Sequence, residues 1–338
     1  MTLALGPLAV PLRPRSLRVA VVLGLLALLA AVAGVIWGDY PLTPDRILAA
    51  LTGRGERMET FVLWSLRLPR LLTGLAAGAA FGVAGALFQS VARNALASPD
   101  VVGFNAGAAL GAVAVIVLLD SGGIGVTAGA IAGGLATALV VGLLSWRRGL
   151  PPERLVLVGI GVGLTLYAVS DLLLIRSDIF DAAEAAAWLT GSLNASGWDE
   201  AARGGIAVAL ALVAVLALTR PLDALALGED TGRGLGIAVT RVKGWAIFLG
   251  VVLAAMATSV AGPVAFVSLL AGPVARHLIG RGGAALFTSG LVGALILTLA
   301  DLAGRLLFAP MQLPAGLFTA AAGAPVLLWL MWRRPRQG

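Results

Sequence analysis

Charged side chains gather in only a few places in this chain, and the largest group lies in Pro221–Lys243. That stretch holds three carboxylates and three basic residues, and four glycines divide it into short pieces. Leu222, Leu225 and Leu227 give its first part an apolar edge, and apolar runs of membrane length flank it on both sides. We expect a structured polar segment of this kind to lie in water and to contact another protein, because lipid cannot satisfy its charges.

Two further groups of charges lie at Arg67 and Arg70, three residues apart around a proline, and at Asp301 and Arg305, four residues apart. The first pair fits two interpretations: interfacial arginines that extend toward water, or an outward cationic pair that binds acidic side chains of an extracellular partner. Residues four apart share one helix face, so Asp301 and Arg305 can pair. Arg305 is either the structural partner of Asp301 or a third docking cation, and the residues leave both open.

The other ionisable residues speak against catalysis. The chain has no cysteine and one histidine, His277, and it lacks the GxxxxGKS/T phosphate loop and any metal-ligand or hydrolytic cluster. We therefore expect no catalytic residue, no metal and no cofactor, with a structural role for His277. Asp171 and Asp301 are the only carboxylates expected near membrane depth. An ion-coupled carrier usually keeps ionisable groups near the midplane, so a secondary transporter is the disfavoured alternative.

Composition assigns the chain to membrane proteins. Of 338 residues, 59% are hydrophobic and 12% are charged, against roughly a quarter charged in soluble domains. The mean hydropathy of +0.98 agrees, and the lipid bilayer is the expected solvent. An isoelectric point near 11.2 could indicate nucleic-acid binding. The basic residues, however, form short clusters between apolar runs, which the positive-inside rule explains, so we expect no nucleic acid.

About ten apolar stretches have the length that a bilayer requires. Their approximate bounds are 19–37, 63–90, 101–119, 122–145, 154–176, 204–219, 244–262, 264–280, 284–308 and 315–332. An even number places both termini on one side. A cleavable signal ending near Ala31-Val32-Ala33 is the rival interpretation for the first stretch, and it is disfavoured because the apolar run continues to Trp37.

Charge asymmetry predicts the orientation. With the termini inside, 16 of the 24 basic residues and 5 of the 17 acidic residues fall on the inner side. This bias places Pro221–Lys243 in the cytoplasm. Glycines repeat every fourth residue at Gly74–Gly82 and Gly103–Gly111. Such faces let helix backbones approach closely, so we expect a compact bundle of many helices.

Seven short motifs, in order from about residue 60 to the C-terminus, resemble those of FecCD/BtuC-type permeases. They are RLPR (Arg67–Arg70), GALFQ (Gly85–Gln89), RNALASPD (Arg93–Asp100), WLTGS (Trp188–Ser192), LGED (Leu227–Asp230), AGPVAFV (Ala261–Val267) and LPAG with GAP (Leu313–Gly316, Gly323–Pro325). Each is weak alone, and together they are specific. These permeases are the membrane subunits of type II ABC importers for iron–siderophore complexes, haem and cobalamin.

The resemblance implies an all-α polytopic fold of ten transmembrane helices in one permease domain, residues 1–338, in the bacterial cytoplasmic (inner) membrane. Residues 1–18 would form a cytoplasmic N-terminal segment and 221–243 a cytoplasmic coupling segment. A second permease subunit, which is either a paralogue or another copy of this chain, would complete the importer together with a cytoplasmic ABC ATPase dimer and a periplasmic or lipid-anchored substrate-binding protein. Hydrolysis of ATP would belong to the separate ATPase, so the chain itself would not be an enzyme.

The resemblance also assigns roles to individual residues. Arg67, Arg70 and Arg305 match the outward arginines that dock the binding protein. The residues matching the helices that contact the ATPase are Leu227, Gly228, Glu229, Asp230, Arg233 and Gly236. Those assigned to the translocation path are Gly272, Pro273, Arg276 and Pro314.

Two departures from the family pattern bear on the substrate. Gly272-Pro273 replaces the Pro-His that commonly precedes Ile-Ala-Arg, and Ala95 replaces the proline of Arg-Asn-Pro-Leu-Ala. Because the eighth span lines the path in relatives, the first change leaves substrate identity open. These variants resemble siderophore systems built from two different permeases, so we expect a ferric-siderophore importer, with cobalamin or haem as the alternative.

Overall fold

A computed structural model describes residues 2–5, 8–11, 14–38, 40–146, 152–280 and 283–332. The apolar helices are α1 (Pro14–Ile36), α4 (Leu68–Ala92), α5 (Phe104–Leu119), α6 (Ile124–Ser145), α7 (Pro152–Arg176), α9 (Trp198–Leu225), α11 (Val239–Ala261), α12 (Val267–Ile279), α13 (Leu286–Leu306) and α14 (Ala315–Trp332). The short elements are strands β1 (Thr2–Leu5) and β2 (Leu8–Pro11), helices α2 (Pro44–Leu51), α3 (Arg57–Phe61), α8 (Ile179–Leu189) and α10 (Glu229–Gly234), and the π-helical segment η1 (Val62–Arg67).

The ten apolar helices coincide with the ten predicted spans. Seven are long and apolar enough to cross a bilayer by length and composition, and α5, α12 and α14 are shorter. With 13 residues, α12 is about 20 Å long, less than the roughly 30 Å of a hydrocarbon core. It therefore needs the irregular segment before it to complete a crossing. The antiparallel hairpin β1–β2 lies within the predicted N-terminal segment.

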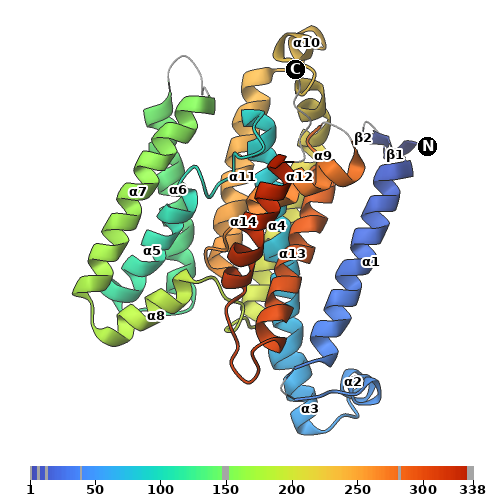
Figure 1. Ribbon diagram of the computed structural model, residues 1–338, viewed down its shortest axis with the longest axis vertical. Helices are drawn as coiled ribbons and strands as arrows, with labels where there is room; N and C mark the ends of the chain where they lie inside the picture. The colour runs from blue at the N-terminus through green and yellow to red at the C-terminus, as the bar shows by residue number, and fades with distance from the viewer. Residues whose placement is uncertain are drawn as a thin grey trace.

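Helix α4 occupies the centre of the bundle, where α9, α11, α12 and α13 pack around it (Figure 1). Its glycines meet neighbouring backbones directly: a Cβ on Gly82 would lie 2.2 Å from the carbonyl oxygen of Ser289, and one on Gly85 would lie 1.8 Å from that of Ser268. Only glycine fits such contacts. These contacts confirm the predicted close packing on small-residue faces. Such packing matters in a membrane because lipid supplies no hydrophobic driving force between helices.

Helices α5–α8 form a second group beside this bundle, shown in green in Figure 1. Their own core includes Ala112, Val113, Ile116 and Ala130. Within this group a Cβ on Gly111 would lie 2.0 Å from the carbonyl oxygen of Gly129. The group meets the central bundle mainly through α11, which packs on α5 and α6.

The two ends of the bundle differ in what they carry. The start of α1, the end of α14 and all of α10 lie toward one end, and α2, α3 and α8 lie toward the other (Figure 1). We call these ends inner and outer. Seven basic residues of the inner-side charge count lie outside the described residues: Arg13, Arg147, Arg148, Arg281, Arg333, Arg334 and Arg336.

Tryptophans mark both ends. All eight lie at or near helix ends, four on each side. The outer four are Trp37, Trp64, Trp188 and Trp198, and the inner four are Trp146, Trp245, Trp329 and Trp332. Indole rings concentrate at membrane–water interfaces, where one part of the ring is in apolar surroundings and its N–H reaches polar groups. The two tryptophan levels therefore bracket the membrane-embedded part of the bundle.

Candidate functional site

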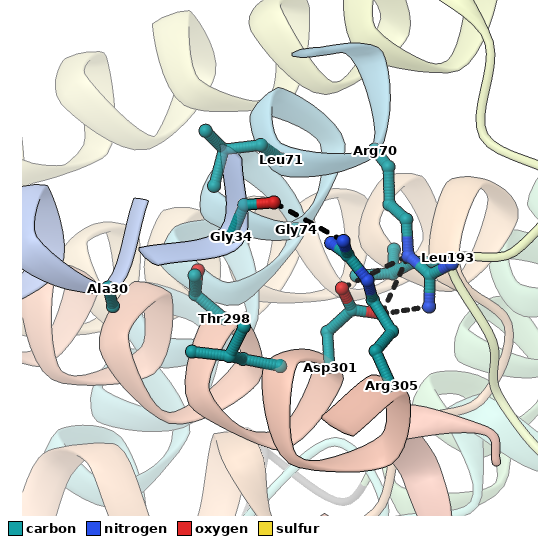
Figure 2. Close-up of a pocket in the computed structure, with 10 residues that line it drawn as sticks. Ala30, Gly34, Arg70, Leu71, Gly74, Leu193, Thr298, Asp301 and Arg305 are labelled. Carbon is teal, nitrogen blue, oxygen red and sulfur yellow. Dashed lines mark hydrogen bonds and ion pairs between the residues drawn. The ribbon is translucent and has the colours of Figure 1, made fainter. Parts of the chain in front are cut away.

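The outer site is built around a buried ion pair between α4 and α13 (Figure 2). Arg70 donates from Nη2 to Oδ1 of Asp301 at 2.7 Å and from Nε to both carboxylate oxygens at 3.0 Å. Its Nη1 donates to Oε1 of Gln312 at 2.9 Å. Side-chain exposure is only 10% for Arg70 and 9% for Asp301. The pair fixes the guanidinium between two helices and the connection that precedes α14.

The other two outer arginines bind the end of α1. The last carbonyls of a helix lack intrahelical partners, and a basic side chain can satisfy them. Arg67 donates to the carbonyls of Ile36, at 3.2 Å, and Tyr40. Arg305 donates to those of Trp37, at 3.0 Å, and Gly34, at 3.3 Å. Together they hold the chain where it leaves α1.

Gly38 shows how tightly this turn is enclosed. A Cβ on Gly38, whose φ is +158°, would lie 2.8 Å from Nη2 of Arg67 and 2.9 Å from Nη2 of Arg305. A cavity of about 10 Å³ remains between α1, α4 and α13, close to the smallest volume that holds one water. The structure thus brings Arg67, Arg70 and Arg305 together, with 5%, 8% and 9% of their surfaces exposed. Their docking role stays a prediction, and in this conformation the chain itself covers them.

The predicted coupling segment 221–243 divides into three parts. Pro221 lies inside α9, which continues to Leu225, and α11 begins at Val239. Between them lies α10, flanked by Gly228 and Gly236, both with positive φ (+130° and +79°). Only a residue without a side chain adopts such φ values at little cost.

An ion-pair network joins α10 to α11. Arg233 bonds Asp230 at 2.6 Å and Glu229 at 3.2 Å, and Lys243 of α11 bonds the second oxygen of Glu229 at 2.5 Å. The hydrogen bond from Lys243 holds the pKa of Glu229 below its usual value. Leu227 and Leu235 are 74% and 65% exposed. The segment therefore offers an apolar edge beside a fixed set of charges.

The end of α9, within the same segment, is linked to α4, α13 and α10. Arg93, just after α4, donates to the carbonyl of Leu225 at 2.9 Å. Asp223 accepts from the backbone N–H of Ala284, before α13, at 2.8 Å. A Cβ on Gly232 would lie 2.6 Å from Cδ2 of Leu225, so α10 packs directly on the end of α9. A displacement of α10 would act on α4, α9, α11 and α13.

The predicted path residues on α12 lie against α4. Gln89 of α4 donates to the carbonyl of Leu269 at 2.9 Å and accepts from Arg276 at 2.7 Å. A Cβ on Gly272 would lie 2.1 Å from Oε1 of Gln89, so the glycine makes room for this amide. Pro273 lies half-buried in the same helix. Arg276 thus contacts α4 in this conformation.

Pro314 belongs to a different place, where irregular segments meet. It is half-buried and ends the connection between α13 and α14. Two residues later, Gly316 donates its backbone N–H to the carbonyl of Gly191 at 2.9 Å. A Cβ on Gly262 would lie 2.7 Å from the carbonyl oxygen of Trp188. The irregular backbone here finds its hydrogen-bond partners in protein.

One carboxylate near membrane depth, that of Asp100, was not predicted from the sequence. The expectation that only Asp171 and Asp301 lie near membrane depth is incomplete, because Asp100 reaches the beginning of α12. It accepts from Oγ of Ser268 at 2.6 Å and from the side-chain amide of Asn105. Ser268 packs on Gly85, two turns before α4 ends, so the connection between α4 and α5 dips back into the bundle.

Asp100 completes a polar chain between the two helical groups. Thr258 of α11 donates to Oδ1 of Asn105 at 3.4 Å, and Asn105 in turn bonds Asp100, which bonds Ser268 of α12. Asn105, Thr258 and Ser268 are buried. The sequence feature that could have indicated this interaction is the RNALASPD motif, whose final residue, Asp100, precedes Asn105 by five residues.

His277 lies at the inner end of α12, with its ring edge-on to Trp329 at a centroid distance of 6.1 Å. Across the described ranges, no group of three or more His, Cys, Asp or Glu side chains could hold a metal ion.

Comparison with known proteins shows which family the chain resembles in sequence and in fold. Residues 25–333 match the model of the FecCD transport family. The chain is 39% identical to the ferric enterobactin transport system permease protein FepG of Escherichia coli, over 93% of this chain and 96% of that protein. It is 36% identical to the probable siderophore transport system permease protein YfhA of Bacillus subtilis, over 93% of each. A transporter assigned to the metal-chelate type of ABC transporter, solved in an inward-facing conformation, aligns with a TM-score of 0.84 at 27% identity, over 94% of this chain and 99% of that chain.

Proposed function

The chain belongs to the FecCD transport family, and we propose that it forms the translocation path of a siderophore-type ABC importer as its permease subunit. It is a multi-pass protein of the inner membrane. The observation that carries the proposal is the near full-length match to siderophore permeases, together with the ten apolar helices, of which α9, α11, α12 and α13 pack around α4. We treat residues 1–338 as one permease domain.

The proposed cargo is a ferric siderophore. Relatives named for ferric enterobactin, other siderophores and ferric citrate support this class over cobalamin and haem. The permease would move its cargo without transforming it. The wall of such a path needs to bind the cargo only weakly, since tight binding would slow release.

Energy is proposed to enter at the inner end from a separate ABC ATPase dimer. The exposed leucines Leu227 and Leu235 and the charges of Glu229, Asp230 and Arg233 form the contact surface. When the ATPase pair closes, the α10 elements of two permease subunits would approach each other. The links of α10 to α9 and α11 would then tilt the bundle and change the side to which the path opens.

At the outer end, Arg67, Arg70 and Arg305 are the proposed docking cations for a substrate-binding protein. Arg67 and Arg305 donate to carbonyls of the turn after α1. A carboxylate of the binding protein would replace those carbonyls and so release the outer end of α1. Docking would in this way be coupled to a movement of α1 against α13.

The path itself is proposed to run along α12 and the irregular segment around Pro314. The backbone of Ser268 packs on Gly85 in the first turn of α12, and Gln89 holds the next turns through side-chain hydrogen bonds to Leu269 and Arg276, which can exchange partners. The second permease subunit is proposed to be a paralogue.

Reconstitution tests the proposal. The permease pair, its ATPase and its binding protein are placed in proteoliposomes, and uptake of a radiolabelled ferric siderophore is measured. We expect uptake that requires ATP and survives a protonophore. Uptake by the permease alone, driven by a proton gradient without the ATPase, would overturn the assignment in favour of a secondary transporter.

A further inference from the structure

An open hollow of about 390 Å³ lies on the outward face of α11 near its inner end. Four residues line it: Arg241, Gly244, Trp245 and Phe248. Their spacing of three, four and seven residues places them on one face of the helix. The hollow is therefore a local feature of α11, in the first turns of a membrane-spanning helix.

The hollow has two aromatic rings that contact each other, and an open space beside them. Trp245 and Phe248 are 59% and 52% exposed, and their rings meet edge to face at 5.7 Å and 81°, a favourable aromatic geometry. A Cβ on Gly244 would meet no other atom within 4 Å, so the missing side chain leaves this space open. Arg241 is exposed, and within the described residues it makes no hydrogen bond or ion pair.

Polarity changes along the hollow in the order found in a phospholipid. Arg241 lies about 10 Å along the helix axis from Phe248, at 1.5 Å per residue. The headgroup layer of one leaflet is roughly 5–8 Å thick, so with Arg241 among the headgroups Phe248 reaches the acyl chains. Trp245 lies between them at the interface level that indole rings prefer.

We propose that this hollow binds an anionic phospholipid of the inner leaflet. Arg241 would bind the phosphate through paired N–H groups, a geometry suited to guanidinium and phosphate. Trp245 would contact the glycerol region, and Phe248 the first part of an acyl chain. The site lies two residues from Lys243, which binds α10, so lipid composition would act on the segment proposed to contact the ATPase.

Fluorescence quenching in lipid nanodiscs tests the site. The full-length chain is placed in nanodiscs with increasing fractions of brominated phosphatidylglycerol or brominated phosphatidylcholine, and the Trp245 contribution is the difference between wild type and Trp245→Phe. We expect half-quenching of that contribution at an about fivefold lower fraction of phosphatidylglycerol, the advantage of one basic residue near an anionic surface. Arg241→Gln should remove the preference, and Arg241→Lys, which keeps the charge without the paired N–H groups, should retain only part of it.

Two matched controls come from the same membrane side. Arg18→Gln changes another exposed inner arginine, on α1, and Trp146→Phe removes another exposed inner tryptophan, after α6; neither should change the Trp245 contribution. Equal quenching by the two lipids in the wild type, or a preference that survives Arg241→Gln, would overturn the proposal. So would a Trp245 that neither lipid quenches, because a protein surface would then cover this face.

Discussion

The ion pair between Arg70 and Asp301 offers the sharpest test of how the outer site is held together. Asp301→Asn keeps the shape of the side chain and removes its charge. The Arg70 guanidinium, which makes three of its hydrogen bonds to this carboxylate, would then lie buried beside a neutral amide. Both side chains are at most one-tenth exposed, so water cannot replace the lost partner.

The expected cost follows from that burial. Removing one partner of a buried ion pair costs about 3–5 kcal/mol. The amide retains one acceptor oxygen, and Gln312 still accepts from Nη1, so we expect a cost near the lower limit, about 3 kcal/mol. That corresponds to a change on the order of a hundredfold in the folding equilibrium.

Equilibrium unfolding in mixed micelles of increasing SDS fraction, followed by tryptophan fluorescence, measures this cost. The control is a cycle with Arg70→Met and Asp301→Leu, since two apolar side chains of similar size often replace a buried pair without loss. We expect the double variant to be more stable than either single variant. A cost below about 1 kcal/mol for Asp301→Asn, typical of an exposed pair, would refute the buried-pair reasoning, as would simple additivity in the cycle.

The same variants separate stability from docking. If Arg70 binds a carboxylate of the binding protein, Asp301→Asn should leave docking as tight as in the wild type or tighter, because it frees the cation. Arg70→Met should weaken docking at low salt, where exposed charges are least screened. Unchanged docking of folded Arg70→Met would leave this arginine with a structural role alone.

Three further substitutions test other parts of the structure. Lys243→Met should change stability by no more than about 1 kcal/mol, because the pair is partly exposed, yet should lower uptake per ATP hydrolysed in proteoliposomes; an unchanged ratio would contradict the coupling role. Lys243 lowers the pKa of Glu229. The contribution of this ion pair to stability is therefore fully present above the ordinary pKa of glutamate and is lost as the pH falls through the lowered pKa. The uptake per ATP hydrolysed by the wild type should accordingly not vary between pH 6 and 8. Gly85→Ala should destabilise the bundle by about 1–3 kcal/mol or more, while Gly24→Ala, with no neighbour within 4 Å, should not; equal melting temperatures would argue against the backbone contact. Ser268→Ala removes one donor from the half-buried carboxylate of Asp100, for which a loss of about 1–3 kcal/mol is expected, and its uptake should fall more than that of the exposed control Thr165→Ala.

The fold was predictable because its main determinant is hydropathy. Ten apolar runs gave ten apolar helices, and the glycine repeats identified faces where backbones touch, as at Gly82. Both signals are local in sequence. The short elements were not predicted as spans since they are too short to cross lipid, and α12 is shorter than its predicted span because its first residues form an irregular segment at Gly262–Phe266.

The contacts of the site were harder to predict because their partners are distant in sequence or belong to the backbone. Asp301 lies one helical turn before Arg305, which suggested a local pair, but the carboxylate is held by Arg70. Arg67 and Arg305 bind carbonyl groups, which every residue carries and no side-chain pattern reveals. Asp100 and Ser268 are separated by 168 positions.

The difference between these two kinds of contact suggests which parts of the permease can move. Where Gly78 and Gly82 of α4 meet α13, backbone touches backbone, and added side-chain atoms would lie within 2.5 Å of carbonyl oxygens; helices packed this closely cannot slide without separating. The first turn of α12 is held in the same way, because a Cβ on Gly85 of α4 would lie 1.8 Å from the carbonyl oxygen of Ser268. Its later turns are attached to α4 by the side-chain hydrogen bond between Gln89 and Arg276, and such bonds can exchange partners at little net cost. We therefore expect α4, α13 and the first turn of α12 to move as one body, with the later turns of α12 and the α5–α8 group moving against it as the path changes the side to which it opens.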